Sequence, residues 1–150
     1  MTDDHLAGLL RRSEQSAYAR LLGIRVISVA SGTSEVELTD TGACTNLMGM
    51  VHGGALFSLM DEAFALACNS YGEVAVALNV AITYVRPAPV AGPLRATAEE
   101  ISRSRRIGTY RMVVRAPTGE LVATAQGIAY RTRRPLAEAS SGDAQSSRRD

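Results

Sequence analysis

A long and almost entirely apolar helix in the middle of the chain sets the strongest limit on what this sequence can fold into. Residues 54–71, GALFSLMDEAFALACNSY, have the length and composition of a helix, and Gly72 directly after them is a common helix stop. The only polar interruptions are Ser58, Asp61, Glu62, Asn69 and Ser70. A helix that is apolar nearly all round has to be covered on every side by other structure.

Strand-like segments before and after this helix can supply the cover. Those that follow it are separated by prolines and glycines and span Val74–Val85, Leu94–Ser104, Ile107–Ala116 and Glu120–Thr132. Before the helix, residues 24–38 alternate in polarity around a turn at 31–34, which predicts a hairpin. A sheet curled around the helix covers the helix and removes one of its own faces from water. We therefore predict an α+β fold with a curled antiparallel sheet around one central helix.

The two ends of the chain differ from this central part. Over residues 1–22 apolar side chains recur at helical spacing and Gly23 ends the pattern, which predicts an N-terminal helical segment. A length of 150 residues supports one domain, which we place at residues 23–134. Residues 135–150 are rich in small and polar side chains, and this composition predicts a disordered tail.

Charge, hydropathy and cysteine content exclude several classes of protein. A net charge of +1 is far from the basic excess of nucleic-acid-binding proteins, so we expect no nucleic-acid partner. No apolar run reaches membrane-spanning length, so we expect no association with a membrane. The N-terminal sequence lacks the apolar core of an export signal, so we expect a cytoplasmic protein. Cys44 and Cys68 fit no metal or disulfide pattern, and with only His5 and His52 beside them we expect no metal site.

The start of the central helix and one carboxylate within it carry the chemistry. Gly53 and Gly54 allow a ligand to approach backbone N–H groups that have no partner inside the helix. Together with the helix dipole, these groups can stabilise negative charge that develops on a carbonyl oxygen. Asp61 is costly in an apolar helix unless it is paired, hydrogen-bonded or protonated. Three explanations account for it: an acid/base role, a buried salt bridge, or a hydrogen bond that caps a loop.

The spacing of these groups favours a site shared by two subunits. Gly53 and Asp61 lie roughly 12 Å apart along one helix, at about 1.5 Å per residue. A general base has to lie within about 3 Å of its target, or one water molecule away. Two antiparallel helices across a dimer axis can each contribute their start to one site and their Asp61 to the other.

Two strings in the chain resemble a known enzyme family. NLMGMVHGGALFSLMDEAFALACNSYG and ITYVRPAPVAGPLRATAEE are similar to hotdog-fold thioesterases of the phenylacetic-acid-degradation (PaaI-like) group. The resemblance covers about residues 20–132. It rests on the combination of HGG, Asp61 eight residues after Gly53, Asn46 six residues before His52, and the Tyr-x-Arg-Pro strand end.

This resemblance implies an enzyme that hydrolyses acyl-CoA, with an aromatic (phenylacetyl-type) or medium-chain acyl group, to free acid and CoA. The Gly53 N–H would polarise the thioester carbonyl, and Asp61 of the other subunit would act as general base or as nucleophile. Asn46 and His52 would position the thioester or the attacking water. The resemblance implies no cofactor, because CoA belongs to the substrate, and it implies a homodimer that associates further as a dimer of dimers. Some relatives carry a Ser or Thr that orients water where this chain has Ala75 and Ala77.

Further residues are candidates for contacts with the substrate, each with a simpler structural explanation. Guanidinium groups bind the phosphates of CoA by a bidentate fork, although charged strand ends are usually only solvated. The arginine candidates are Arg86, Arg103, Arg105 and Arg106, and Gly54 is a candidate through its backbone. Asn79 is a candidate for lining the acyl or pantetheine path, with a hydrogen bond to a loop as its alternative role. Arg86 has pairing with a carboxylate as its alternative role. His52 has two alternative roles, catalysis and bracing of the glycine loop.

Two other functions compete with hydrolysis. A non-catalytic acyl-CoA-binding module would use the same groove but would gain nothing from Asp61. A hotdog hydratase or dehydratase would require an acid/base histidine on a different element, and only His52 is at hand.

Overall fold

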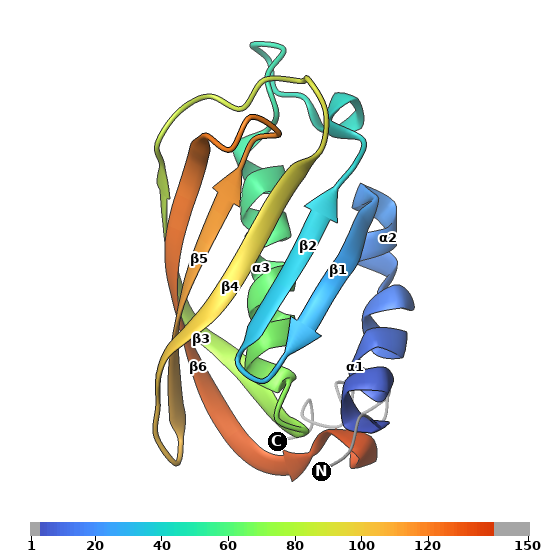
Figure 1. Ribbon diagram of the computed structural model, residues 1–150, viewed down its shortest axis with the longest axis vertical. Helices are drawn as coiled ribbons and strands as arrows, with labels where there is room; N and C mark the ends of the chain where they lie inside the picture. Colours follow the sequence, from blue (N-terminus) through green and yellow to red (C-terminus); the bar gives the residue numbers. More distant parts are fainter. Residues whose placement is uncertain (1–3, 140–150) are drawn as a thin grey trace, which may run out of the picture.

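The computed structural model describes residues 4–139 and shows a single antiparallel sheet that curls around one long helix, α3 (Gly53–Asn69) (Figure 1). The sheet has six strands in the order β1-β2-β4-β5-β6-β3. Their bounds are β1 Ile24–Ala30, β2 Thr33–Leu38, β3 Glu73–Tyr84, β4 Leu94–Arg103, β5 Ile107–Arg115 and β6 Leu121–Pro135. This arrangement confirms the predicted α+β fold with a central helix.

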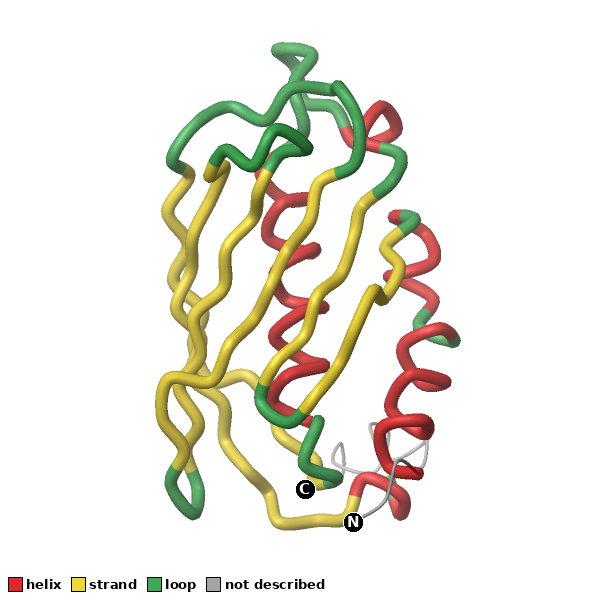
Figure 2. Tube along the Cα trace, viewed as in Figure 1, coloured by secondary structure: helices red, strands yellow, loops and turns green. Residues whose placement is uncertain are grey.

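The hydrophobic core lies between α3 and the concave face of the sheet, along which the helix runs (Figure 2). Phe64 on α3 is fully buried and packs against Tyr110 on β5, with ring centroids 5.4 Å apart. Gly127 on β6 makes this contact possible, because an added Cβ there would lie 2.9 Å from Phe64 Cζ. The apolar sequence of the helix is thus explained by a sheet that covers most of its circumference.

The neighbour of β3 differs from the order of strands along the chain. β3 directly follows α3, but it pairs with β6 along almost its whole length and not with β4. β3 therefore forms one edge of the sheet and β1 the other. The N-terminal helices cover β1, whereas the outer edge of β3 has no neighbour among residues 4–139.

The N-terminal segment contains two helices where the sequence pattern predicts one. α1 (Asp4–Glu14) ends before Ser16, whose side chain caps the start of α2 (Ala17–Leu22). Ser and Thr side chains compete with the backbone for hydrogen bonds, so a Ser within a helical pattern also marks a new helix start. Gly23 then ends α2 in a left-handed conformation, as its position in the sequence predicts.

The ordered chain continues past residue 135, where the sequence predicts the tail to begin. A short 3-10 helix, η2 (Leu136–Glu138), follows β6, and Arg12 on α1 donates to the carbonyls of Leu136 and Ala139. The remainder of the predicted tail, residues 140–150, lies outside the described residues. None of the helices that the structure describes has the length and apolar character needed to cross a membrane.

Candidate active site

The loop before α3 and the first turn of the helix form a compact unit. His52 is the N-cap residue of α3, and its Nδ1 accepts the backbone N–H of Gly54 at 2.8 Å. This contact occupies the Gly54 N–H, so that group is not available to a substrate. The Gly53 N–H has no acceptor among residues 4–139. Gly53 therefore presents the one unpaired donor of this glycine pair, at the positive end of the helix dipole.

Tyr84 at the end of β3 lies against Gly53. Its hydroxyl donates to the Gly53 carbonyl at 3.1 Å, and a Cβ at Gly53 would meet the tyrosine ring at 3.2 Å. Glycine is thus favoured at position 53 partly because a larger residue would crowd the Tyr84 ring. The sequence reasoning did not assign Tyr84 a role, although the Tyr-x-Arg-Pro string marked its position.

Asn46 holds the turn that leads to His52. Its Oδ1 accepts the backbone N–H of Met48 at 2.9 Å and that of Met50 at 3.1 Å. Gly49 within the turn has a positive φ of 74°, which an L side chain rarely adopts. The carbonyl of the Asn46 side chain is thus engaged in the loop, whereas no acceptor for its amide nitrogen is found among the described residues.

Two substitutions of Asn46 test whether it takes part in the predicted reaction as well as holding the loop. Asn46→Asp keeps the oxygen that holds Met48 and Met50 but replaces the amide donor, so we expect it to retain the melting temperature and lose turnover by about 10- to 100-fold. Asn46→Ala removes the oxygen as well and should lower both. Thermal unfolding and thiol-release assays of the two variants check this. Full turnover by Asn46→Asp would show that Asn46 only holds the loop.

Asp61 lies on the exposed side of α3, two turns after Gly53. Phe57 and Ala65 are one turn away on either side of it and belong to the same helix face. Although the side chain reaches the protomer surface, partial burial among such neighbours raises the pKa of the Asp61 carboxyl. No ion pair of Asp61 is found within residues 4–139. The structure thus offers no salt bridge as an explanation for this charge.

The neighbouring acid, Glu62, has a different environment. Its Oε1 accepts a hydrogen bond of 2.5 Å from the Ser13 hydroxyl on α1, and nearby Tyr18 on α2 is bonded to Ser58 on α3. These hydrogen bonds hold α1 and α2 against the side of α3 that lies next to Asp61. The sequence pattern did not reveal them, because they join residues about 40 to 50 positions apart.

Cys68 is buried on α3, and this burial raises the pKa of its thiol to about 12. A thiol in this state is a weak nucleophile at neutral pH. Its position agrees with the expected role in the core.

The predicted phosphate-binding arginines lie at the other end of α3 from Gly53. Arg103 stacks on the ring of Tyr71, just past the helix, with its guanidinium carbon 3.7 Å from the ring centroid. Arg106, at the β4–β5 turn, donates to the Tyr130 hydroxyl at 2.8 Å, and Arg105 between them is exposed. A helix of 17 residues spans about 25 Å, so these side chains are remote from Gly53 of the same chain.

The two remaining candidates lie on or next to β3. Arg86 pairs with Glu120 at 2.6 Å, which is the alternative that the sequence left open for it. Asn79 is exposed and follows an irregularity in the pairing of β3 with β6. Neither of them approaches the start of α3 through a contact found in the structure.

Comparison with known proteins identifies the family. The family model described as "Thioesterase superfamily" matches residues 48–123, which include Gly53, Asp61 and Tyr84. The chain is 38% identical over 118 residues to acyl-coenzyme A thioesterase PaaI of Escherichia coli, a match that covers 79% of this chain and 84% of the other. Human acyl-coenzyme A thioesterase 13 is 30% identical over 110 residues, which cover 71% and 79% of the two chains.

Solved structures agree with this assignment. The E. coli PaaI protein from the phenylacetic acid degradation operon superposes with a TM-score of 0.81 at 34% identity, over 89% of this chain and 99% of that one. A mutant form of the phenylacetic acid degradation protein PaaI from Thermus thermophilus superposes with a TM-score of 0.72 at 38% identity, over 76% and 97%. Fold, motif and relatives therefore agree that this chain is a hotdog-fold member of the thioesterase superfamily, in its PaaI-like group.

Proposed function

We propose that the protein hydrolyses acyl-CoA thioesters to a free carboxylic acid and CoA. One observation carries the proposal: an unpaired backbone N–H at the start of α3 and an unpaired carboxylate with a raised pKa lie on the same helix. The first can polarise a carbonyl, and the second can take a proton from water. The names of the relatives, acyl-coenzyme A thioesterases of E. coli and human, support CoA as the thiol part of the substrate.

In the reaction that we propose, the thioester oxygen accepts the Gly53 N–H. A water oxygen attacks the carbonyl carbon while Asp61 takes a proton from that water. The tetrahedral intermediate collapses, the C–S bond breaks, and Asp61 returns its proton to the CoA sulfur. In the other version of the mechanism, the Asp61 carboxylate attacks the carbon directly, the C–S bond breaks and CoA leaves as a thiolate. Water then hydrolyses the resulting anhydride to the free acid and the Asp61 carboxylate, and a proton from that water passes to the CoA sulfur. The acyl groups that we favour are aromatic, of the phenylacetyl type, or medium-chain.

We further propose that two copies share each site. Eight residues separate Gly53 from Asp61 on α3, or about 12 Å, so one chain cannot bring both groups to one carbonyl. The open edge of β3 supports a second copy, because its unpaired backbone groups and the exposed side chains of Val76 and Leu78 form a template for strand pairing. A two-fold axis through that edge places both α3 helices antiparallel on the same side of a continuous sheet. Further association of two such dimers stays a prediction.

This arrangement gives the distant arginines a role. When Asp61 of a second copy lies beside Gly53, the α3 helix of that copy extends about 12 Å beyond Gly53. Its far end carries the Arg103–Tyr71 stack and the exposed Arg105. We propose that these guanidinium groups bind CoA phosphates in the site of the other copy.

Release of free thiol from a panel of acyl-CoAs tests the function. The panel contains aromatic and aliphatic acyl groups of increasing length, and the free CoA thiol is measured over time. We expect turnover with at least one member, and the preferred acyl group defines the substrate class. Saturable binding without thiol release from any member would contradict hydrolysis and favour the non-catalytic binding module.

A further inference from the structure

The outer, convex face of the sheet carries a row of charged side chains whose signs alternate except at one end. In this row, Arg25 on β1 lies opposite Glu37 on β2, which lies opposite Arg95 on β4, which lies opposite Arg115 on β5. The signs alternate along the first three strands, and then two arginines face each other. Like charges directly opposite each other on neighbouring strands repel.

The first three members of the row are compensated. Glu37 is almost fully buried, pairs with Arg25 at 2.6 Å and with Arg95 at 2.9 Å, and has its pKa lowered, mainly by the hydrogen bond from Arg25. Glu35 on the adjacent row pairs with Arg95 at 3.2 Å. The row and Glu35 together contain three arginines and two carboxylates, and among residues 4–139 both carboxylates pair only with Arg25 and Arg95, so one positive charge is left over.

That charge belongs to Arg115. Its Nη1 donates to the Gly119 carbonyl at 2.9 Å, and no carboxylate lies within ion-pair distance of it in the part of the chain that the structure describes. Arg111, four residues earlier on the same face, has Glu99 at 2.8 Å. A guanidinium has five donors in a planar fork, so Arg115 retains donors for an oxyanion.

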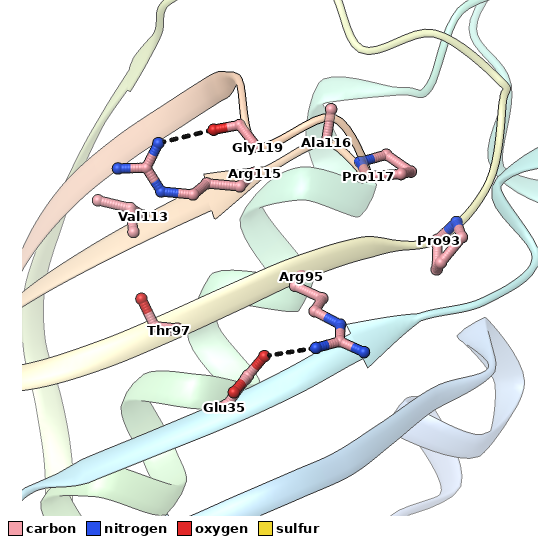
Figure 3. A pocket seen from close by; sticks show the side chains of 9 residues that line it. All are labelled: Glu35, Pro93, Arg95, Thr97, Val113, Arg115, Ala116, Pro117 and Gly119. Carbon is pink, nitrogen blue, oxygen red and sulfur yellow. Dashed lines mark hydrogen bonds and ion pairs between the residues drawn. The ribbon is translucent and has the colours of Figure 1, made fainter.

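A pocket of about 400 Å³ lies beside Arg115 on this face (Figure 3). Arg95, Arg115, Thr97 and Glu35 contribute its polar lining, and the Glu35 carboxylate is engaged by Arg95 and not by Arg115. Pro93, Val113, Ala116 and Pro117 contribute an apolar wall. These residues come from the outer face of the sheet and the loops at its end, whereas Gly53 and Asp61 belong to the helix on the concave side.

We infer that this pocket binds a small organic carboxylate, with its anionic group on the Arg115 guanidinium and its hydrocarbon part against Val113 and Pro117. An anion bound at Arg115 would restore the alternation of positive and negative charge in the row, because Arg115 lies opposite Arg95. A planar carboxylate matches the guanidinium fork, and the apolar wall favours a ligand with a hydrocarbon part over inorganic phosphate. The inference does not depend on the proposed hydrolysis.

Titration of the full-length protein with hexanoate, benzoate and inorganic phosphate, followed by NMR, tests this. We expect both carboxylates to shift the backbone amide signals of Val113 and Gly119 and the Nε–H signal of Arg115 saturably, with phosphate at least about 10-fold weaker. Arg115→Gln should weaken carboxylate binding at these signals by about 10-fold or more, since it removes a charge-assisted contact. Reading local signals separates this pocket from any carboxylate bound near Asp61.

Arg111→Gln is the matched control, because it removes an arginine from the same strand and face that already has a carboxylate partner. It should leave the titration unchanged, and thermal unfolding confirms that both variants fold. The inference is overturned by an absence of saturable shifts at these signals, or by equal binding to the Arg115→Gln variant. It is also overturned if phosphate binds as well as the carboxylates, or if the signals respond to protein concentration and not to ligand, which would assign this face to contacts between copies.

Discussion

Asp61→Asn is expected to lower kcat/KM for acyl-CoA hydrolysis by about 10²- to 10⁴-fold, the usual contribution of a general base. Asn has nearly the same size and shape as Asp but cannot take a proton or attack a carbonyl. The fold should persist, because Asp61 makes no ion pair within residues 4–139 and lies on the exposed side of α3. Thiol-release kinetics of the variant and the wild type measure the effect.

Glu62→Gln is the matched control for this substitution. It neutralises the next carboxylate on the same helix, which is bonded to Ser13 and is not assigned to the reaction. We expect turnover to stay within a few-fold of the wild type. Equal losses in the two variants would show that α3 tolerates no change in charge at this point and would remove the argument for Asp61.

Because the pKa of Asp61 is raised, we expect both the activity and the effect of Asp61→Asn on stability to depend on pH. If Asp61 is the base, kcat/KM rises as its carboxyl loses its proton, with a midpoint above the ordinary aspartate value of about 3.9. Because the folded-state pKa lies above the unfolded one, the folded protein loses stability as pH rises through this interval. Asp61→Asn should therefore melt at a higher temperature than the wild type at pH 7, and this difference should shrink as the pH is lowered. A lower melting temperature at pH 7 would contradict the assigned environment.

Gly53→Pro is expected to cause the second large loss, about 10²- to 10³-fold in kcat, because it removes the N–H to which we assign polarisation of the carbonyl. The helix itself tolerates this change. Gly53 is the first residue of α3, where proline is favoured, and His52 before it has the extended conformation that proline requires.

Gly53→Ala separates loss of the N–H from steric effects. It adds the same Cβ beside the Tyr84 ring, 3.2 Å from it, but keeps the N–H. We expect its activity to lie between those of the wild type and Gly53→Pro. If both variants lose activity equally, the cause is displacement of Tyr84, and the N–H has no demonstrated role.

The fold could be predicted from the sequence because its main determinant is local. The apolar run at residues 54–71 requires cover all round, and the observed α3 begins and ends within two residues of the predicted bounds. The order of the strands could not be predicted in the same way. β3 and β4 are neighbours along the chain, yet β3 pairs with β6, because pairing depends on which edges meet in space and not on the alternation within a strand.

The main residues of the candidate site could also be named from the sequence, and their roles in the reaction stay predictions. Gly53 and Asp61 stood out because glycines at a helix start and a charge in an apolar helix are unusual in any sequence. The engagement of the Gly54 N–H by His52, and the contact of Tyr84 with Gly53, depend on side-chain orientation and on β3 returning past the helix start. Such tertiary contacts leave no periodic signal in the sequence.

Subunit mixing tests whether two copies share each site. Asp61→Asn and Gly53→Pro chains, each nearly inactive alone, are unfolded together at equal concentration and refolded, and native mass spectrometry confirms that mixed dimers form. In a mixed dimer, one shared site contains both changes and the other contains neither. We therefore predict that the mixture recovers about one quarter of wild-type activity, since half of the dimers are mixed and each has one intact site. If mixed dimers form and activity stays at the level of the separate variants, Gly53 and Asp61 act within one chain and the shared-site account is wrong.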